Sequence, residues 1–317
     1  MIALMTDIRT LAEKMRADWN RRIDHDYRFW MSDGHLSDEI MWETGERDLS
    51  MLIDGILLPE QKSVLEVGCG VGRLLRPAAA RFKRVVGIDV SDVAIQHAKE
   101  LLRDKGVINN SIQLLVGNGS DLREIADRSI DVACSFAALT SMPTTVIANY
   151  LREFHRVLDC AGVARIQMYL GKAHRVLEGD TLHLRCYDSG CFSKACELAG
   201  FEVEWISDLN LPFQVSLEEK GIKAVLVSLK RNDREPHSCD EISRALLPEG
   251  EVQESEIVDP EAFYIAGLEH LMALKYAEEL STRGEIERAR AAINYAASLA
   301  RPRSVQVCEL LDRIVDS

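Results

Sequence analysis

Between residues 63 and 230, short apolar runs alternate with stretches of helical spacing, and this pattern predicts most of the fold. The apolar runs indicate strands at 64–67, 85–88, 112–116, 130–135, 163–169, 201–206 and 223–229. Helical patterns separate most of them, for example at 94–102 and 146–158. Such alternation is typical of a mostly parallel sheet with helices on both faces. No clear helix separates the last two strands, which predicts an antiparallel edge.

The two ends of the chain differ from this region. Residues 1–52 combine helical spacing with three of the four tryptophans, which predicts an N-terminal helical cap on a core at 53–230. Residues 231–260 are polar and acidic and contain Pro236, Pro248 and Pro260, which is typical of a linker. Helical periodicity returns at 261–317 and predicts a C-terminal helical hairpin.

Composition and charge narrow the class of protein. With 47% hydrophobic and 28% charged residues in 317, general disorder is excluded. The net charge of −13, without a basic run, argues against a nucleic-acid partner. No stretch approaches the roughly 18 apolar residues of a membrane span, and charge appears too early for a secretory signal. We therefore expect a cytoplasmic location.

The eight cysteines form no CxxC pair and no Cys/His spacing typical of zinc. Scattered cysteines of this kind are usually reduced thiols in a reducing compartment. The sequence therefore predicts no metal site and no disulfide framework.

The strongest chemical signal is a glycine loop after the first strand. The strand at 64–67 runs directly into Gly68, Gly70 and Gly72 and then into a helix. Glycine permits a sharp turn and lets a ligand approach the backbone, while a helix start supplies free N–H groups. Such a turn is a nucleotide-type binding device.

Glycine spacing decides between classes of nucleotide. A dinucleotide fingerprint needs a third glycine at position 73 or 75, where the chain has Arg73 and Leu75. No Gly-Lys-Ser/Thr follows, so the phosphate-binding P-loop is excluded as well. These mismatches argue against a nicotinamide-dependent oxidoreductase.

Polar residues end three neighbouring strands. Glu66 precedes the glycine loop, where a carboxylate favours a cationic ligand group. Asp89 ends the second strand and can accept hydrogen bonds from both ribose hydroxyls. Asn118 follows the third strand in a turn that could bracket an adenine edge, or it simply completes that turn. Ligands of open α/β sheets bind at this carboxyl edge.

These motifs resemble the class I S-adenosylmethionine-dependent methyltransferases over residues about 53–230. The resemblance rests on Glu66-Val67-Gly68-Cys69-Gly70-Val71-Gly72, Gly87-Ile88-Asp89-Val90-Ser91, Gly117-Asn118-Gly119-Ser120-Asp121-Leu122, and the stretches 128–135, 151–158 and 187–203. It implies a Rossmann-like, mostly parallel sheet of seven strands. It also implies S-adenosyl-L-methionine as cofactor and S-adenosyl-L-homocysteine as product.

The resemblance also implies roles for individual residues. The residues expected to bind the cofactor are Glu66, Gly68, Cys69, Gly70, Gly72, Arg73, Asp89, Val90, Asn118, Gly119, Leu122 and Ser135. Glu66 and the glycine loop hold the methionine part, and Asp89 binds the ribose. Asn118 replaces the usual adenine-binding Asp, and the Leu122 amide also reaches toward adenine. Ser141 stands where many relatives carry His, so the family supplies no general base.

Candidate catalytic groups come from the fifth strand and the helix before it. Tyr169 and Gln167 end the strand and could face an acceptor, or merely finish the strand; His155 is a further candidate, or a packing histidine. Other groups that could orient an acceptor are Thr140, Ser141, His174 and His183. His25, His35, Tyr27 and Trp30 precede the core and could shape the acceptor pocket.

We therefore predict methyl transfer to a small molecule, with O-methylation of a small or sugar-like acceptor as the first hypothesis. Alternatives are an N- or protein-side-chain methyltransferase recruited through residues 261–317, and a non-catalytic cofactor-binding protein. The C-terminal hairpin is similar to one tetratricopeptide repeat. It could also be a plain helical hairpin. In either case its apolar face could dock on the core, serve self-association or bind a protein partner.

Overall fold

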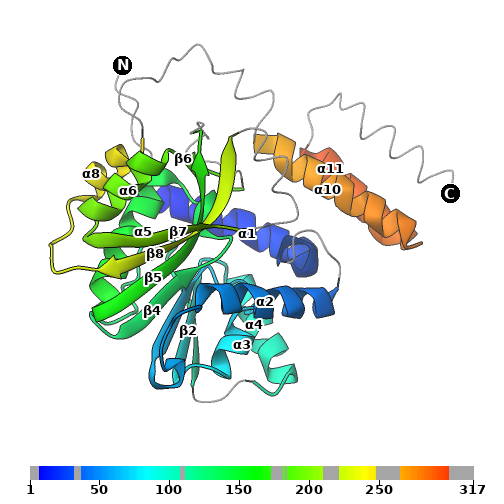
Figure 1. The fold of residues 1–317 in the computed structure, drawn as a ribbon. Coiled ribbons are helices and arrows are strands. Elements are labelled where there is room, and N and C mark those ends of the chain that lie inside the picture. The colour runs from blue at the N-terminus through cyan, green and yellow to red at the C-terminus, as the bar shows by residue number, and fades with distance from the viewer. Residues whose placement is uncertain are drawn as a thin grey trace, which may run out of the picture. The chain divides into compact units, whose positions relative to one another are not determined.

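The computed structural model describes residues 7–31, 37–107, 111–172, 181–182, 184–209, 221–247 and 265–299 (Figure 1). The chain divides into two compact units, Met1–Glu251 and Val252–Ser317. The first unit carries the sheet and the predicted cofactor-binding residues. Within the described residues 265–299, the second contains two helices.

One eight-stranded sheet forms the centre of the first unit. Its strands are β1 (Ser63–Val67), β2 (Arg84–Asp89), β3 (Ile112–Val116), β4 (Ile130–Ser135), β5 (Leu158–Gly171), β6 (Cys186–Tyr187), β7 (Phe201–Asp208) and β8 (Ile222–Arg231). They run in the order β3-β2-β1-β4-β5-β8-β7, with β6 beside β5. The strands from β1 to β6 pair in parallel, as the alternation predicts.

The structure corrects the sheet in two details. The predicted count of seven strands is wrong because β6 adds an eighth, and its two residues are too few to leave an apolar pattern. An antiparallel strand is present, as predicted, but it lies one place in from the edge. β8 pairs antiparallel with both β5 and β7, so β7 forms the edge.

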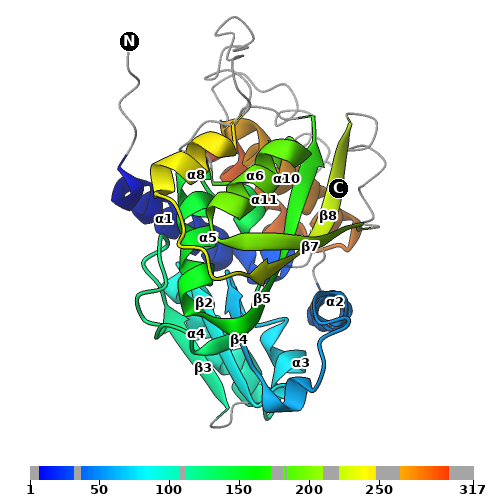
Figure 2. The same cartoon turned by 60° about the vertical axis from the view of Figure 1, so that its left-hand side comes forward.

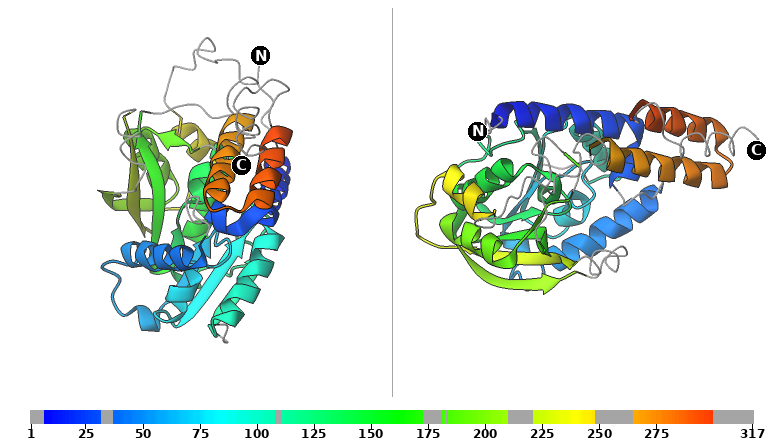
Figure 3. Two further views of the ribbon diagram at one scale, coloured as in Figure 1. Left: turned by 90° about the vertical axis from the view of Figure 1, so that its right-hand side faces the viewer. Right: turned by 90° about the horizontal axis from the view of Figure 1, so that it is seen from above.

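Helices cover both faces of the sheet, as Figures 2 and 3 show. The elements are α1 (Ile8–Met31), α2 (Asp38–Leu52), α3 (Leu75–Ala79), α4 (Asp92–Asp104), α5 (Thr144–Val157), α6 (Ser189–Leu198) and α8 (Cys239–Ala245), with short 3-10 turns η1 (Pro59–Gln61) and η2 (Leu139–Ser141). One apolar cluster joins α5, α6 and α8 to the sheet through Phe154, Phe192 and Ile242. The other includes Leu49 and Ile95 from α2 and α4. Burying each such side chain stabilises the fold by about 1.5–3 kcal/mol.

Helix α1 of the predicted cap and the start of the predicted linker have more structure than the sequence pattern indicates. Helical geometry in α1 breaks at Asp26 (φ −170°, ψ 105°), so the final turn takes a new direction. Within the predicted linker 231–260, a capping box at Ser238 and Glu241 starts α8. Ile242 of α8 is fully buried, so this part of the linker packs on the core.

In the second unit, α10 (Ile265–Thr282) and α11 (Ile286–Leu299) pack on each other as a helical hairpin. Ala277 and Ile293 are fully buried. Its similarity to a tetratricopeptide repeat stays a prediction. Among the helices that the structure describes in either unit, none is long and apolar enough to cross a membrane.

Candidate active site

The glycine loop after β1 folds back on the end of β2. The amides of Gly68 and Cys69 donate hydrogen bonds to the Ile88 carbonyl at 2.8 and 3.2 Å. Gly68 and Gly70 adopt φ values of +75° and +51°, which side chains with a Cβ rarely tolerate. A Cβ on Gly70 would lie 2.5 Å from the sulfur of Met31. Because both conformation and space require glycine, the bare backbone of the loop forms a wall of the pocket.

Asp89 connects this loop to β2. Its Oδ2 accepts a hydrogen bond from the Gly70 amide and its Oδ1 accepts one from the Ser91 amide, each at 2.8 Å. Burial raises the pKa of the Asp89 carboxyl, and these amide hydrogen bonds work against that rise. Ser91 then caps α4 by accepting from Ala94 at 3.0 Å. The carboxylate is thereby fixed at the carboxyl edge of the sheet.

Glu66 is a buried carboxyl with an unsatisfied oxygen. Its side chain lines the pocket, and the residue is 3% exposed. Oε2 has no hydrogen-bond partner among the described residues. Burial raises the pKa of Glu66 to about 8, partly offset by the positive charge of Arg73. An unpaired buried acceptor is costly, so this position suits a cationic ligand group.

The loop after β3 is held by its own side chains. Oδ1 of Asn118 accepts from the amides of Ser120 and Asp121 at 2.8 and 3.0 Å, and its Nδ2 donates to Asp121. The Leu122 amide donates to Glu153 Oε2 at 2.9 Å. The Asn118 side chain and the Leu122 amide, which the sequence predicts to bind adenine, therefore already form hydrogen bonds within the protein. Gly119 of the same loop lines the pocket.

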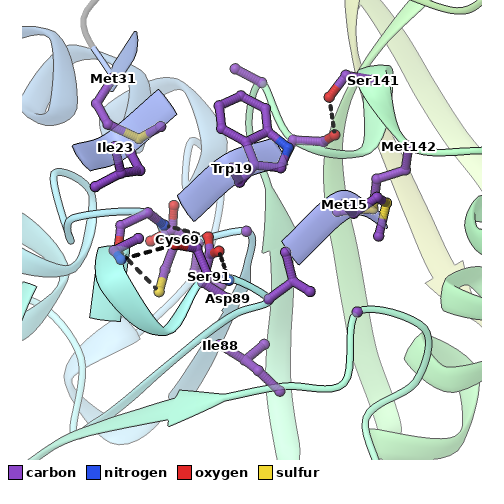
Figure 4. A pocket seen from close by; sticks show the side chains of 18 of the residues that line it. Met15, Trp19, Ile23, Met31, Cys69, Ile88, Asp89, Ser91, Ser141 and Met142 are labelled. Carbon is purple, nitrogen blue, oxygen red and sulfur yellow. Dashed lines mark hydrogen bonds between the residues drawn. The ribbon is translucent and has the colours of Figure 1, made fainter. Parts of the chain in front are cut away.

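Helix α1 covers the pocket (Figure 4). Met15, Trp19 and Ile23 follow one face of the helix at four-residue spacing and line the pocket, together with Trp30 and Met31 beyond the break at Asp26. The guanidinium of Arg16 anchors the helix by donating to the carbonyls of Val90 (3.0 Å) and Gly117 (2.8 Å).

The segment after β4 forms the remaining wall. Phe136, Ala137, Ala138, Ser141 and Met142 line the pocket there, and Tyr150 of α5 joins them. Ala137 has a φ of +57°, unusual for a residue with a Cβ. Its amide donates to Gln167 Oε1 at 2.8 Å, which helps to hold this conformation.

Comparisons with known proteins agree with this geometry. Residues 64–162 match the family model of a methyltransferase domain. An uncharacterised methyltransferase of Schizosaccharomyces pombe is 27% identical over 180 residues, covering 51% of this chain and 67% of that protein. This chain contains a class I methyltransferase domain.

Two solved methyltransferase structures share its fold. One is the Synechocystis magnesium protoporphyrin IX methyltransferase with bound S-adenosylmethionine (TM-score 0.53, 16% identity, covering 73% of this chain and 100% of that one). The other is the 1,6-didemethyltoxoflavin-N1-methyltransferase of Burkholderia thailandensis, with bound 1,6-didemethyltoxoflavin and S-adenosylhomocysteine (TM-score 0.54, 18% identity, covering 74% of this chain and 94% of that one). These structures show the shared fold; with the matched domain model and the Schizosaccharomyces pombe relative, the protein is a methyltransferase with S-adenosylmethionine as its cofactor.

The methyltransferase pocket gathers many of the residues predicted to bind the cofactor. Those that line it are Glu66, Gly68, Cys69, Gly70, Arg73, Asp89, Val90 and Gly119. Gly72, Asn118, Leu122 and Ser135 lie outside its lining; the Ser135 hydroxyl donates to the Val67 carbonyl at 2.9 Å. The binding roles of both groups remain predictions. A buried acceptor on Glu66 and the backbone exposed at Gly68 and Gly70 fit the charged amino-acid end of this cofactor.

The predicted catalytic residues lie outside the pocket lining. Gln167 supports the main chain of Ala137, and Tyr169 is buried in an apolar cluster. His155 bonds through Nε2 to the Asn232 carbonyl at 2.9 Å and packs edge-on against Phe201. Burial lowers the pKa of His155.

Of the other residues that the sequence suggests for the acceptor site, some line the pocket and others are buried or hydrogen-bonded elsewhere in the protein. Ser141 and Trp30 line the pocket, whereas Thr140 is fully buried and Tyr27 donates to Asp38 at 3.0 Å. His25 is described but is not part of the lining. The candidates His35, His174 and His183 lie outside the described residues.

Sequence reasoning missed several pocket residues, namely Met15, Trp19, Ile23, Met31, Phe136, Met142 and Tyr150. The spacing of Met15, Trp19 and Ile23 was available as a signal, since it aligns them on one helix face. Nothing in the local pattern distinguishes that face from ordinary core packing.

Proposed function

We propose that this methyltransferase transfers the methyl group to an oxygen of a small molecule with an apolar body. The observation that carries the proposal is the composition of the pocket wall beyond the predicted cofactor-binding residues. That wall is apolar and rich in sulfur and aromatic rings, from Met15, Trp19, Met31, Phe136 and Met142. Such side chains adapt to flat apolar ligands. They offer little to a sugar, which needs many hydrogen-bond partners.

The chemistry of the wall favours an acceptor that ionises easily. Among the described lining residues, the only carboxyl groups are Glu66 and Asp89, which we assign to the cofactor, and the lining contains no histidine or lysine. The remaining side-chain hydroxyls are Ser91, Ser141 and Tyr150. A strong general base is thus missing from this wall. A carboxylate, or a phenol or enol of low pKa, needs none.

The residues of the chain would then act mainly by binding and orientation. Bound S-adenosylmethionine supplies an activated methyl group on its sulfonium. Glu66 receives the ammonium group of the cofactor, Asp89 accepts hydrogen bonds from its ribose, and the glycine loop contributes main-chain amides. Helix α1 excludes water from the pocket. Holding nucleophile and methyl carbon at about 3–3.5 Å can contribute roughly 7–11 kcal/mol.

The test is transfer of an isotope-labelled methyl group to matched acceptors. Aromatic carboxylic acids and acidic phenols are compared with the corresponding amines, with monosaccharides and with a protein extract, and products are identified by mass spectrometry. We expect labelled esters or ethers of the apolar acids. Labelling confined to amines, sugars or protein would contradict the proposal and support one of the alternatives.

A further inference from the structure

Helix α2 forms an ion pair with Arg73, the residue that follows the glycine loop. Nη1 of Arg73 donates to Oδ2 of Asp48 on α2. Asp48 is 1% exposed, and its other oxygen accepts from Arg47 Nε at 2.9 Å. Both carboxylate oxygens are therefore used, and the side chain has little freedom. A charge-assisted pair this deeply buried fixes the position of its partners.

A second contact brings α2 against the main chain of the same arginine. Gly45 lies one turn before Asp48, on the same face of the helix. A Cβ at Gly45 would lie 2.3 Å from the Arg73 carbonyl oxygen. Glycine inside a helix is unfavourable, so this close approach accounts for it. Gly45 and Asp48 together hold the backbone and the guanidinium of Arg73.

Arg73 faces the ligand side as well. It lines the pocket, and its guanidinium carbon lies 5.5 Å from the centre of the Phe136 ring. Its positive charge lies close enough to Glu66 to offset part of the rise that burial causes in the pKa of that carboxyl. One acidic and one basic side chain thus stand together in the pocket. This pair complements a ligand that carries an ammonium and a carboxylate on one carbon.

We propose that Asp48 is a positioning residue for cofactor binding. It holds Arg73 where the guanidinium meets the carboxylate of the methionine end, while Glu66 meets the ammonium. The proposal rests on the assignment of Arg73 to the cofactor, made above. It makes α2, outside the methyltransferase motifs, part of the recognition of the amino-acid end.

Comparing the binding of two nucleosides distinguishes a positioning role of Asp48 from a general structural role. S-adenosylhomocysteine carries the amino-acid end, and 5′-methylthioadenosine lacks it. We expect Asp48→Asn to weaken binding of S-adenosylhomocysteine about tenfold or more, as loss of a charge-assisted contact does, in calorimetry with the full chain. Binding of 5′-methylthioadenosine should change less than about twofold. Glu46→Gln, which removes the exposed pair with Arg81 on the same helix, is the matched control.

The outcomes distinguish the proposal from the cofactor assignment. Equal losses for both nucleosides, or unchanged affinity for S-adenosylhomocysteine, would overturn the role of Asp48. If the wild-type chain binds neither nucleoside, the cofactor assignment itself fails, and this proposal with it.

Asp48→Asn leaves the Arg73 guanidinium without its carboxylate partner, which could destabilise the fold. Two further variants control for this effect. Arg73→Gln alone and Asp48→Asn/Arg73→Gln together leave no unpaired buried arginine at position 73. If Asp48 acts through Arg73, the single variant Arg73→Gln and the double variant should show the same reduced affinity for S-adenosylhomocysteine. A further loss in the double variant would contradict the proposal.

Discussion

The amide of Gly70 donates a 2.8 Å hydrogen bond to Oδ2 of Asp89, joining the glycine loop of β1 to the end of β2. The two ligand-facing elements are thereby preorganised relative to each other before any nucleoside arrives. The other oxygen, Oδ1, accepts the Ser91 amide, and we propose that remaining lone pairs of the carboxylate accept the ribose hydroxyls. We propose that this one carboxylate both holds the glycine loop and binds the ligand.

Asp89→Ala should weaken S-adenosylhomocysteine binding by at least about tenfold, because charge-assisted hydrogen bonds contribute ~1.5–3 kcal/mol each. Calorimetry measures the loss. The control is Asp92→Ala on α4, which removes an exposed contact with Asn20 outside the pocket lining. Equal affinity of Asp89→Ala and wild type would refute the ribose-binding role.

Cofactor affinity should rise with pH because of Glu66. With a pKa of about 8, its carboxyl is mostly protonated at neutral pH in the ligand-free enzyme. Binding of the ammonium group favours the ionised form, so affinity should increase from pH 6 toward 8 and then level off. Glu66→Gln should bind more weakly, without this dependence. A pH profile shared by both proteins would exclude Glu66 as its source.

The same carboxyl should affect stability in the opposite direction. Its folded pKa lies above the ordinary value of 4.5, so the folded state holds an extra proton between pH 4.5 and about 8. The contribution of this group is complete below pH 4.5 and declines as pH rises through 8. Relative to Glu66→Gln, the ligand-free wild type should lose stability across this window in urea unfolding. Parallel curves would count against a buried, protonated Glu66.

Gly70→Ala should damage the site more than its backbone strain explains. Alanine at φ +51° costs about 1–2 kcal/mol, and its Cβ would also collide with Met31. Gly55→Ala is the control, because its φ is +74° and a Cβ there meets nothing within 4 Å. Both variants should lower the melting temperature, but only Gly70→Ala should lose cofactor binding. Adding Met31→Ala to the Gly70→Ala variant should restore part of the lost cofactor binding. If binding is not restored, the steric explanation is contradicted.

Gln167 should act on the rate through Ala137 rather than by touching the acceptor. Gln167→Met removes the oxygen that accepts the Ala137 amide, so we expect kcat to fall about tenfold with cofactor affinity unchanged. Gln167→Glu keeps an acceptor oxygen and should recover part of the rate. If Gln167→Glu is as slow as Gln167→Met, the hydrogen bond is not what matters.

Removing the second unit should leave the cofactor site intact, since every lining residue precedes Glu251. A chain ending at Glu251 should bind S-adenosylhomocysteine within about twofold of the full chain. We also propose that residues 261–317 mediate self-association or bind a protein partner. Light scattering on both chains tests self-association, and an identical subunit number would exclude it.

Local sequence was sufficient for the central strands and for the glycine loop that follows β1. The positive φ of Gly70 and the strand-end position of Asp89 follow from residue type and spacing, because turns and strand ends are short-range features. By contrast, β6 escaped prediction because a two-residue strand exists only through its pairing with β5. The buried helix α8 escaped for a similar reason, since its apolar contacts come from elsewhere in the chain.

The sequence by itself determined the central parallel strands, the glycine loop after β1 and the class of cofactor, since each depends on residues close together along the chain. Only the tertiary structure decided which side chains complete the pocket. Trp19 and Met31 reach the pocket from α1, and Asp48 reaches Arg73 from α2. Helical periodicity shows that a face is apolar but not what it covers, because packing joins residues that are distant in sequence.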